Sequence, residues 1–569
     1  MKKTIILLLM ALSATAFAQR GSWGEFPMIP SKSLSARRAE TTKIKDTPAY
    51  FKALKIYERL REARGDFRYP VPTFYITQEE TVAEISYIEN VIYLGEKAFK
   101  VCESFGENSE AAIAFLLAHE LTHYYEKHAW RGNFYHEYSG ISLARQMDST
   151  YQAMLAGAAD PAMRKLLMRF DTLSVYAEKA AMEAQSDYLG GFLAYSAGYG
   201  AFTQGPEIIR RLYAEFGLTD DLPGYMTRSE REQLSLRSAQ QLQDLVDLFE
   251  MANLLTAVGQ YEDAYRYYRK VLTEYQSREV YNNVGATALL QALKLFKAEE
   301  LKFRYPVQLD LEMANTRGPE EEAMRKKLLE QAVLHFDAAI SLDPGYAPAF
   351  LNKACALALL GDSQRARFYA DVEARRVATG KYAANVAAIE ILLGILDAES
   401  GTAEGIEKAK SRWMAVSNGG KNALATYNLA ILKNEAPPAA PSEGLSFFDN
   451  ESIDGQEALT LSNLMEDKMI QVDKIITYHR NNQQSENARL LFNRRSSKTS
   501  ILFLVTKPGY SQPSARGIKI GDARSAVENK YGPAPRSILT TTGELLVYAD
   551  ILFVMKDGKV EKWALTKVF

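Results

Sequence analysis

Runs of apolar residues divide the chain into segments with different periodicities. Between residues 71 and 94, the short runs Phe74–Ile76, Ala83–Ile88 and Val91–Leu94 are rich in β-branched and aromatic residues, which predicts a small β-sheet. The next run, Ala111–Ala118, is apolar on every face of a helix. Because such a helix has no polar face to turn toward water, the pattern predicts a buried helix directly after the sheet.

A different pattern follows in the middle of the chain, where small and aromatic residues recur at helical spacing. Gly259–Ala264, Tyr281–Gly285 and Ala332–Pro344 each fit the turns and helices of tetratricopeptide repeats. A generic helical domain is the alternative, because close helix packing also selects small residues four positions apart. We predict tetratricopeptide-like helical repeats over residues 236–433, stacked into a concave peptide-binding surface.

The composition changes again at Ala436–Pro441, a proline-rich stretch that predicts a stiff linker at residues 434–444. Beyond this stretch, Ile501–Val505 and Ile551–Met555 have the apolar, β-branched character of strands. A distinct unit should follow the linker. We therefore predict a small C-terminal α/β module over residues 445–569.

Local signals in this module indicate a turn and a polar surface. Asp557 and Gly558 stand between two apolar runs and predict a β-hairpin. His479, Arg494 and Arg495 lack the spacing of a ligand or catalytic set, so we interpret them as solvated surface residues. No chemistry is assigned to the module.

The N-terminal residues have the three parts of a secretory signal peptide. They are a basic pair, an apolar run and a small-x-small cleavage site: Lys2 and Lys3, Ile5–Leu12 and Ala16–Ala18. The apolar run is too short for a membrane anchor, since a helix needs about 20 apolar residues to span a bilayer. We expect a signal peptide at residues 1–18 with cleavage before Gln19, and a polar lead-in segment at residues 19–45. The mature chain is then an exported periplasmic or cell-envelope protein without a transmembrane segment.

Length, charge and cysteine content restrict the remaining classes of protein. At 569 residues, the chain is long enough for three or four domains. Its formal net charge of −2 provides no basic field for a phosphate backbone, so we expect no nucleic-acid partner. The two cysteines, Cys102 and Cys355, exclude a Cys-rich zinc module. Any metal site must therefore use histidines and carboxylates.

The buried helix leads into an HExxH motif from His119 to His123. Residues four apart share one face of a helix, so both imidazoles can reach one zinc ion. Glu120 then lies beside the metal and can take a proton from a water molecule that the metal activates. A chance match in an unrelated helix is disfavoured, because four of the six histidines, including His128 and His136, fall within eighteen residues. The motif predicts a metallopeptidase site with one Zn2+ per chain.

A catalytic zinc site needs a third protein ligand, which is commonly a glutamate from a second helix. Residues 175–190 have a helical pattern, and Glu183 and Asp187 lie four apart on one face. One carboxylate can bind the metal while the other accepts the free ring N–H of a ligating histidine. Solvated helix charges are the alternative interpretation of this pair. Other candidates for the third ligand are Glu126, His128, His136 and Glu178.

These residues resemble the gluzincin metallopeptidases of family M-forty-eight, which include heat-shock membrane peptidases, prenyl-protein proteases and periplasmic outer-membrane-assembly proteases. Leu117–His123 followed by His128 is similar to the AHELxHxxxxH helix of that family, and Glu183–Gly190 is similar to its ExxADxxG helix. Ile88–Leu94 is similar to the strand that borders the substrate cleft. Ser186 stands where the family usually has alanine.

The resemblance implies an α+β zincin-type metallopeptidase domain over residues 46–235. It implies that His119, His123 and Glu183 are the zinc ligands. Glu120 would be the general base, and Asp187 would be the carboxylate that supports a ligand. It also implies that Asn90, Val91 and Ile92 belong to an edge strand that binds the substrate backbone.

Together these patterns predict a multidomain, mainly α protein that acts as an exported zinc-dependent metalloendopeptidase on envelope or misfolded proteins. Its repeats would recruit polypeptide substrates or outer-membrane assembly partners. The alternative is a chaperone-like repeat scaffold with a latent or self-blocked zinc site. A non-peptidase zinc hydrolase is disfavoured, because HExxH helices are mostly proteolytic. Tyr188 and His136 are candidates for stabilising the oxyanion.

Overall fold

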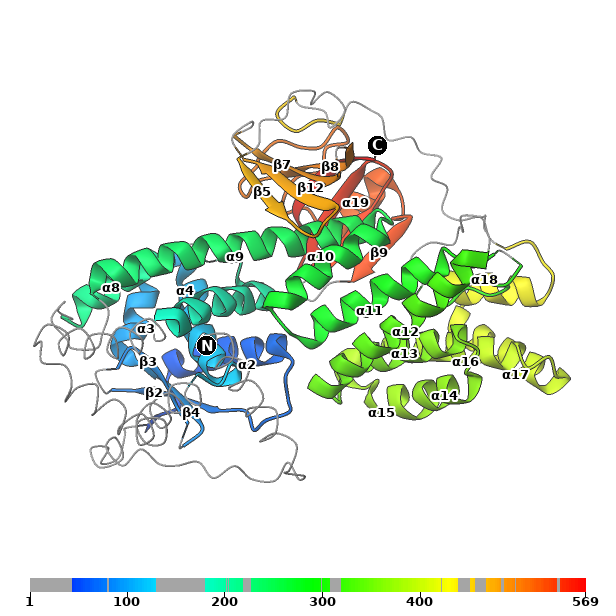
Figure 1. The fold of residues 1–569 in the computed structure, drawn as a ribbon, viewed down its shortest axis with the longest axis horizontal. Coiled ribbons are helices and arrows are strands. Elements are labelled where there is room, and N and C mark those ends of the chain that lie inside the picture. The colour runs from blue at the N-terminus through cyan, green and yellow to red at the C-terminus, as the bar shows by residue number, and fades with distance from the viewer. Residues whose placement is uncertain are drawn as a thin grey trace, which may run out of the picture.

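The computed structural model of the chain describes residues 43–128 and 180–568, apart from short gaps. These gaps are residues 79–80, 88, 201, 203, 218–226, 298, 308–318, 421, 438–450, 456–466, 483–485, 497 and 540–542. The predicted signal peptide, the lead-in segment up to residue 42 and the linker from residue 438 lie outside the described residues, as do His136 and Glu178. The described part is mainly α-helical with two β-sheets (Figure 1). None of its helices combines the length and apolar character needed to cross a membrane.

The first sheet has four strands and lies where the apolar runs predict it. In spatial order the strands are β1 (Lys43–Ile44), β2 (Thr73–Thr77), β4 (Val91–Gly95) and β3 (Ala83–Ser86). β2 runs parallel to β4, and the other neighbouring pairs are antiparallel. Every residue of β4 is buried, as expected for a strand with neighbours on both sides.

The position of β4 corrects one prediction. Val91 and Ile92 belong to an interior strand, because β2 pairs with one side of β4 and β3 pairs with the other. Asn90 precedes this strand in a turn with a φ of 53°, and its amide donates to the carbonyl of Val71 at 3.3 Å. The predicted edge strand at Asn90, Val91 and Ile92 is therefore wrong. On this side of the sheet the edge strand is β3.

Helices enclose the predicted buried helix, which is confirmed as α4. The helices around the sheet are α2 (Pro48–Arg64), α3 (Glu96–Glu103) and α4 (Ser109–Tyr125). α4 contacts α2, α3, β3 and β4, and its residues from Ala112 to Ala118 are all buried. A further helix at residues 180–194 continues into the π-helical turn η3 (Tyr195–Tyr199) and is followed by α8 (Gly205–Glu215). We call the helix at residues 180–194 the crossing helix.

The helix α9 (Arg228–Ala257) joins the first unit to the rest of the protein. It runs without interruption for 30 residues, and its N-terminus has a capping box formed by Thr227 and Glu230. No glycine or proline occurs within it. The predicted boundary between residues 235 and 236 falls inside this helix. The two predicted domains share α9 as a common element.

The middle of the chain forms a helical array in which helices adjacent in sequence pack together. Its helices are α10 (Tyr261–Glu274), α11 (Arg278–Leu293), α12 (Pro319–Leu342), α13 (Ala347–Leu359), α14 (Ser363–Phe368), η4 (Tyr369–Ala374), α15 (Arg375–Val377), η5 (Gly380–Tyr382), α16 (Asn385–Ala398), α17 (Ala403–Ser417) and α18 (Ala423–Leu432). A Cβ atom on Gly285 would lie 2.6 Å from the ring of Phe336, and one on Gly394 would lie 2.3 Å from the indole of Trp413. These two glycines therefore make room for large aromatic side chains of the neighbouring helix.

The C-terminal part is an eight-stranded antiparallel sheet with one helix, α19 (Arg524–Tyr531). In spatial order its strands are β5 (Lys468–Gln471), β6 (Ile476–Asn481), β7 (Ala488–Arg495), β8 (Lys498–Thr506), β12 (Lys559–Val568), β11 (Ile551–Lys556), β10 (Gly543–Val547) and β9 (Arg536–Leu539). The predicted hairpin is confirmed between β11 and β12. Asp557 and Gly558 have φ values of 50° and 75°, which a tight two-residue hairpin turn requires.

This sheet lies against α9 and α10 (Figure 1). Buried carboxylates of these two helices form ion pairs with basic side chains of the sheet. Asp247 of α9 has no exposed side-chain surface and pairs with Arg480 of β6. Glu250, one turn further along α9, pairs with Arg489 at 2.7 Å and with Lys562. Burial alone would raise the pKa of Glu250, but these two cations lower it to about 2, so the carboxylate remains charged. A buried acidic face of α9 is thus neutralised by the sheet.

Two residues that the sequence analysis interprets as solvated surface take other positions in the structure. His479 is only 3% exposed and stacks on Phe492 of the neighbouring strand. Arg495 donates to Asp263 of α10 at 2.8 Å. The surface interpretation is wrong for His479, which is buried within the sheet unit itself. Arg495 is partly exposed, as the interpretation expects, but it also pairs with the buried Asp263.

The buried interface yields a prediction about stability. Arg489→Ala leaves Glu250 and Asp247 with too little positive charge, and removing one partner of a buried ion pair typically costs about 3–5 kcal/mol. Lys468→Ala is the matched control, because it removes a partly exposed pair with Asp244 from the same interface, worth at most about 1 kcal/mol. Thermal unfolding and limited proteolysis should show a released C-terminal sheet for Arg489→Ala only. Equal behaviour of the two variants would contradict the assignment.

Candidate metal centre

The crossing helix approaches α4 without side chains between the two backbones at one point, Gly190. A Cβ atom at this position would lie 2.9 Å from the carbonyl carbon of Ala118 and from the amide nitrogen of His119. Only glycine permits this approach. This contact sets the distance between the two helices. It lies at Ala118 and His119, where the HExxH motif begins. It brings the preceding two turns of the crossing helix over that motif.

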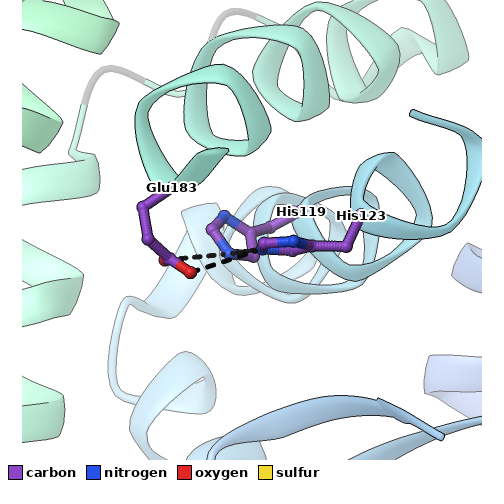
Figure 2. A group of neighbouring side chains, drawn as sticks. All are labelled: His119, His123 and Glu183. Carbon is purple, nitrogen blue, oxygen red and sulfur yellow. Dashed lines mark hydrogen bonds and ion pairs between the residues drawn. The ribbon is translucent and has the colours of Figure 1, made fainter. Parts of the chain in front are cut away.

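Three side chains from these helices converge on one point (Figure 2). The Nε2 atoms of His119 and His123 lie 3.0 Å apart. The two carboxylate oxygens of Glu183 lie 3.4 Å from His119 Nε2 and 3.5 Å from His123 Nε2, respectively. A tetrahedral zinc ion with bonds of about 2.0–2.1 Å separates its ligand atoms by about 3.3 Å. The spacing of these three ligand atoms therefore fits one zinc ion, and this trio is the one group of potential ligands found among the described residues.

Asp187 supports His119 from the side away from the convergence point. Its Oδ1 lies 2.9 Å from His119 Nδ1, so the ring donates there and leaves Nε2 free to bind a metal. Asp187 is only 2% exposed, and Arg231 of α9 donates to both of its oxygens, at 2.5 and 2.8 Å. Burial would raise the pKa of Asp187, but the arginine holds it below the usual range. The aspartate is therefore an ionised acceptor.

Glu120 lies next to the ligands but does not point at the same atoms. Its Oε2 accepts a hydrogen bond of 3.0 Å from the backbone N–H of Ile85 in β3. Burial raises the pKa of Glu120 to about 7, although positive charge on His119 opposes this shift. The edge strand thus fixes the carboxylate of the motif beside the three converging side chains.

The two histidines differ in their affinity for protons when no metal is present. Burial lowers the pKa of His119, but its hydrogen bonds to Asp187 and Glu183 outweigh burial and raise that pKa to about 10. Burial and the neighbouring charge of His119 lower the pKa of His123 to about 3. A metal that binds here must replace the proton on His119, as is general for histidine sites.

The alternative third ligands take other positions. His128 is buried, but its Nδ1 faces the Nδ1 of His123 at 2.9 Å, on the side opposite the convergence point. Glu126 pairs with Arg64 at 3.3 Å. Tyr188, a candidate for stabilising the oxyanion, donates to Glu274 of α10 at 2.8 Å. None of these three joins Glu183 at the centre.

Sequence reasoning missed two groups that build the centre. Arg231 lies 44 positions after Asp187 in a strongly charged stretch, where it resembles any exposed helix arginine. The second group, the amide of Ile85, belongs to the backbone, so no residue type in the sequence indicates it. An unpaired buried carboxylate is costly, so the need for a cation near Asp187 could have been inferred, but not which one.

Comparisons with known proteins add little to this geometry. No protein-family model and no curated protein matches the chain. Among solved structures that match is a monomeric mutant of IFIT1 with Gppp-AAAA, which is 13% identical with a TM-score of 0.23. The match covers 46% of this chain and 64% of that one, less than two thirds of its length. At this TM-score the similarity supports no conclusion about fold or function.

The helix contact at Gly190 yields a second prediction. Gly190→Ala places a methyl group against backbone atoms of α4, so the helices must separate, at a cost of about 1–3 kcal/mol. The ligands should then move apart, and binding of Zn2+ measured by calorimetry should weaken. Gly191→Ala is the control, because its methyl group meets only the end of the Leu242 side chain. Unchanged Zn2+ binding by Gly190→Ala would show that the close approach is not required.

Proposed function

We propose that this protein is a zinc-dependent endopeptidase. The observation that carries the proposal is the convergence of His119 Nε2, His123 Nε2 and the Glu183 carboxylate within 4.8 Å of one another, next to the carboxylate of Glu120. Two imidazoles and one carboxylate are a ligand set that catalytic zinc sites use, and they leave a fourth position for water or substrate. The order of residues in the HExxH motif supports the same reaction class.

The chain's own residues have distinct roles in this proposal. Zinc, when bound, supplies Lewis acidity that polarises the scissile carbonyl and makes water more acidic. Glu120 accepts a proton from the attacking water and later delivers it to the leaving amine. Asp187 holds the proton of His119 on Nδ1, while Arg231 keeps Asp187 ionised. The buried position of these groups strengthens each electrostatic interaction.

The substrate strand is assigned to β3 in place of Asn90, Val91 and Ile92. β3 pairs with β4 on one side, and no described strand pairs with its other side. It also contacts α4, and its residue Ile85 donates to Glu120. An extended polypeptide that adds to β3 would therefore pass beside the proposed catalytic carboxylate.

The wider context of the proposal comes from the sequence. The expected signal peptide supports export to the periplasm or cell envelope, and the helical array supports recruitment of polypeptide substrates or envelope partners. The alternative is a chaperone-like scaffold whose zinc site is latent or self-blocked. The helical array is a specific observation in its favour, because it forms a large part of the described chain. The two functions differ in whether Glu120 is needed.

A third prediction separates these functions. Glu120→Gln removes the proton acceptor but no proposed ligand, so the purified variant should retain about one Zn2+ per chain. Its rate of hydrolysis of an unfolded test protein should fall by about 10²- to 10⁴-fold, the usual contribution of a general base. Glu110→Gln, at an exposed position of the same helix, is the control. A wild-type chain that takes up no Zn2+ would refute the proposal, and full activity of Glu120→Gln would move proteolysis elsewhere or favour the scaffold.

A fourth prediction separates the two carboxylates of the crossing helix. Glu183→Ala removes one of three ligands and should abolish stoichiometric Zn2+ binding. Asp187→Asn preserves the shape of the side chain but accepts the imidazole proton less well, so Zn2+ affinity should fall by about 10- to 100-fold. Metal analysis and circular dichroism of both variants test this order. Equal, negligible effects of the two changes would contradict the assigned roles.

A further inference from the structure

His128 occupies a place in the metal centre that the proposed ligand set does not explain. Its Nδ1 lies 2.9 Å from His123 Nδ1, and its Nε2 lies 3.1 Å from Oε1 of Gln185. Ser186 Oγ lies 3.2 Å from the same Nδ1 of His128. His128 is 3% exposed, and Ser186 is fully buried. A buried imidazole is therefore held between a proposed ligand and the crossing helix.

The distances permit one arrangement of protons that is compatible with metal binding. His123 can bind a metal through Nε2 only if its own proton sits on Nδ1. That proton must be donated to His128 Nδ1, which must then be an acceptor. The proton of neutral His128 consequently sits on Nε2, where the Gln185 carbonyl oxygen accepts it at 3.1 Å. Each donor in this chain of three groups meets an acceptor.

We infer that His128 is a positioning residue that fixes His123 in the tautomer and orientation needed for metal binding. The inference rests on the proposed function, since it assumes that His123 is a ligand. Gln185 orients His128 in turn, by accepting its Nε2 proton. Gln185 lies on the crossing helix between Glu183 and Asp187. One helix thus supplies a ligand directly, orients His119 through Asp187, and orients His123 through His128.

The different partners of the two histidines follow from charge. Glu183 and Asp187 already place two carboxylates at the centre, and Arg231 pairs with both, at 3.4 Å from Glu183 and 2.5 Å from Asp187. A third carboxylate behind His123 would add another negative charge to this buried site. A neutral imidazole accepts the same proton without adding charge to a buried site. This accounts for a histidine at position 128 where metal sites more commonly have a carboxylate or carbonyl oxygen.

The test compares two substitutions of His128 in the full-length protein, with Zn2+ alone as the probe. His128→Leu retains an apolar side chain of similar size but has no acceptor, and Zn2+ affinity should fall by about 10- to 100-fold. His128→Asn places an oxygen close to the former Nδ1 position and should recover most of that loss. His335→Leu, a half-buried histidine on α12 far along the chain, is the control and should leave Zn2+ affinity unchanged.

A spectroscopic readout separates positioning from general destabilisation. In the Co2+-substituted protein, each ligating histidine contributes a strongly shifted exchangeable N–H resonance. Two such resonances should persist in the wild type and in His128→Asn, and one should be lost by exchange in His128→Leu. If the wild type binds Zn2+ but His128→Leu binds it equally well with both resonances, the inference is overturned and the proposed function stands. If the wild type binds no Zn2+, the proposed function fails first.

Discussion

The ionised carboxylate of Asp187 is the group on which the arrangement of the first unit depends. It is almost completely buried, so it must be neutralised and hydrogen-bonded where it stands. His119 of α4 and Arg231 of α9 satisfy it together. Three helices that are far apart in sequence are therefore tied to one side chain. The separation of α4 from the crossing helix is set by Gly190, three residues later.

α9 extends this dependence to the remainder of the protein. Arg231 lies near its start, and Glu250 lies nineteen residues further on, which is about 28 Å along a helix. The start of α9 thus contributes Arg231 to the candidate metal centre, and its later part contributes Glu250 to the contact with the C-terminal sheet. Two further hydrogen bonds join the C-terminal sheet to the first unit. Lys556 donates to the carbonyl of Gly198, close to the end of the crossing helix. Arg536 donates to the carbonyl of Ala257, the last residue of α9. Among the described residues, the first unit and the helical array are joined through α9, and the C-terminal sheet packs on the same helix.

The features that could be predicted from the sequence are those that depend on the spacing of residues only a few positions apart. The HExxH spacing places His119 and His123 on one face, the pair Glu183 and Asp187 lies on the same helix four residues apart, and both expectations agree with the geometry. The all-apolar run of α4 and the Asp557-Gly558 turn are local signals of the same kind. Arg231 and the Ile85 amide act through long-range contacts, for which no spacing rule exists. The interior position of β4 also depends on pairing with two other strands, and a single strand pattern does not specify its neighbours.

The acidic face of α9 has a consequence for how this chain can be divided. Asp244, Asp247 and Glu250 follow one another at intervals of three residues, so their charges lie on one side of the helix and repel one another. The cations opposite them come from β5, β6, β7 and β12, all of which follow the proline-rich stretch in sequence. A fragment that ends at that stretch would keep the acidic side chains and lose the basic ones. The apparent linker is thus a poor place to cut this protein, because the helix before it is electrostatically complete only with the strands after it.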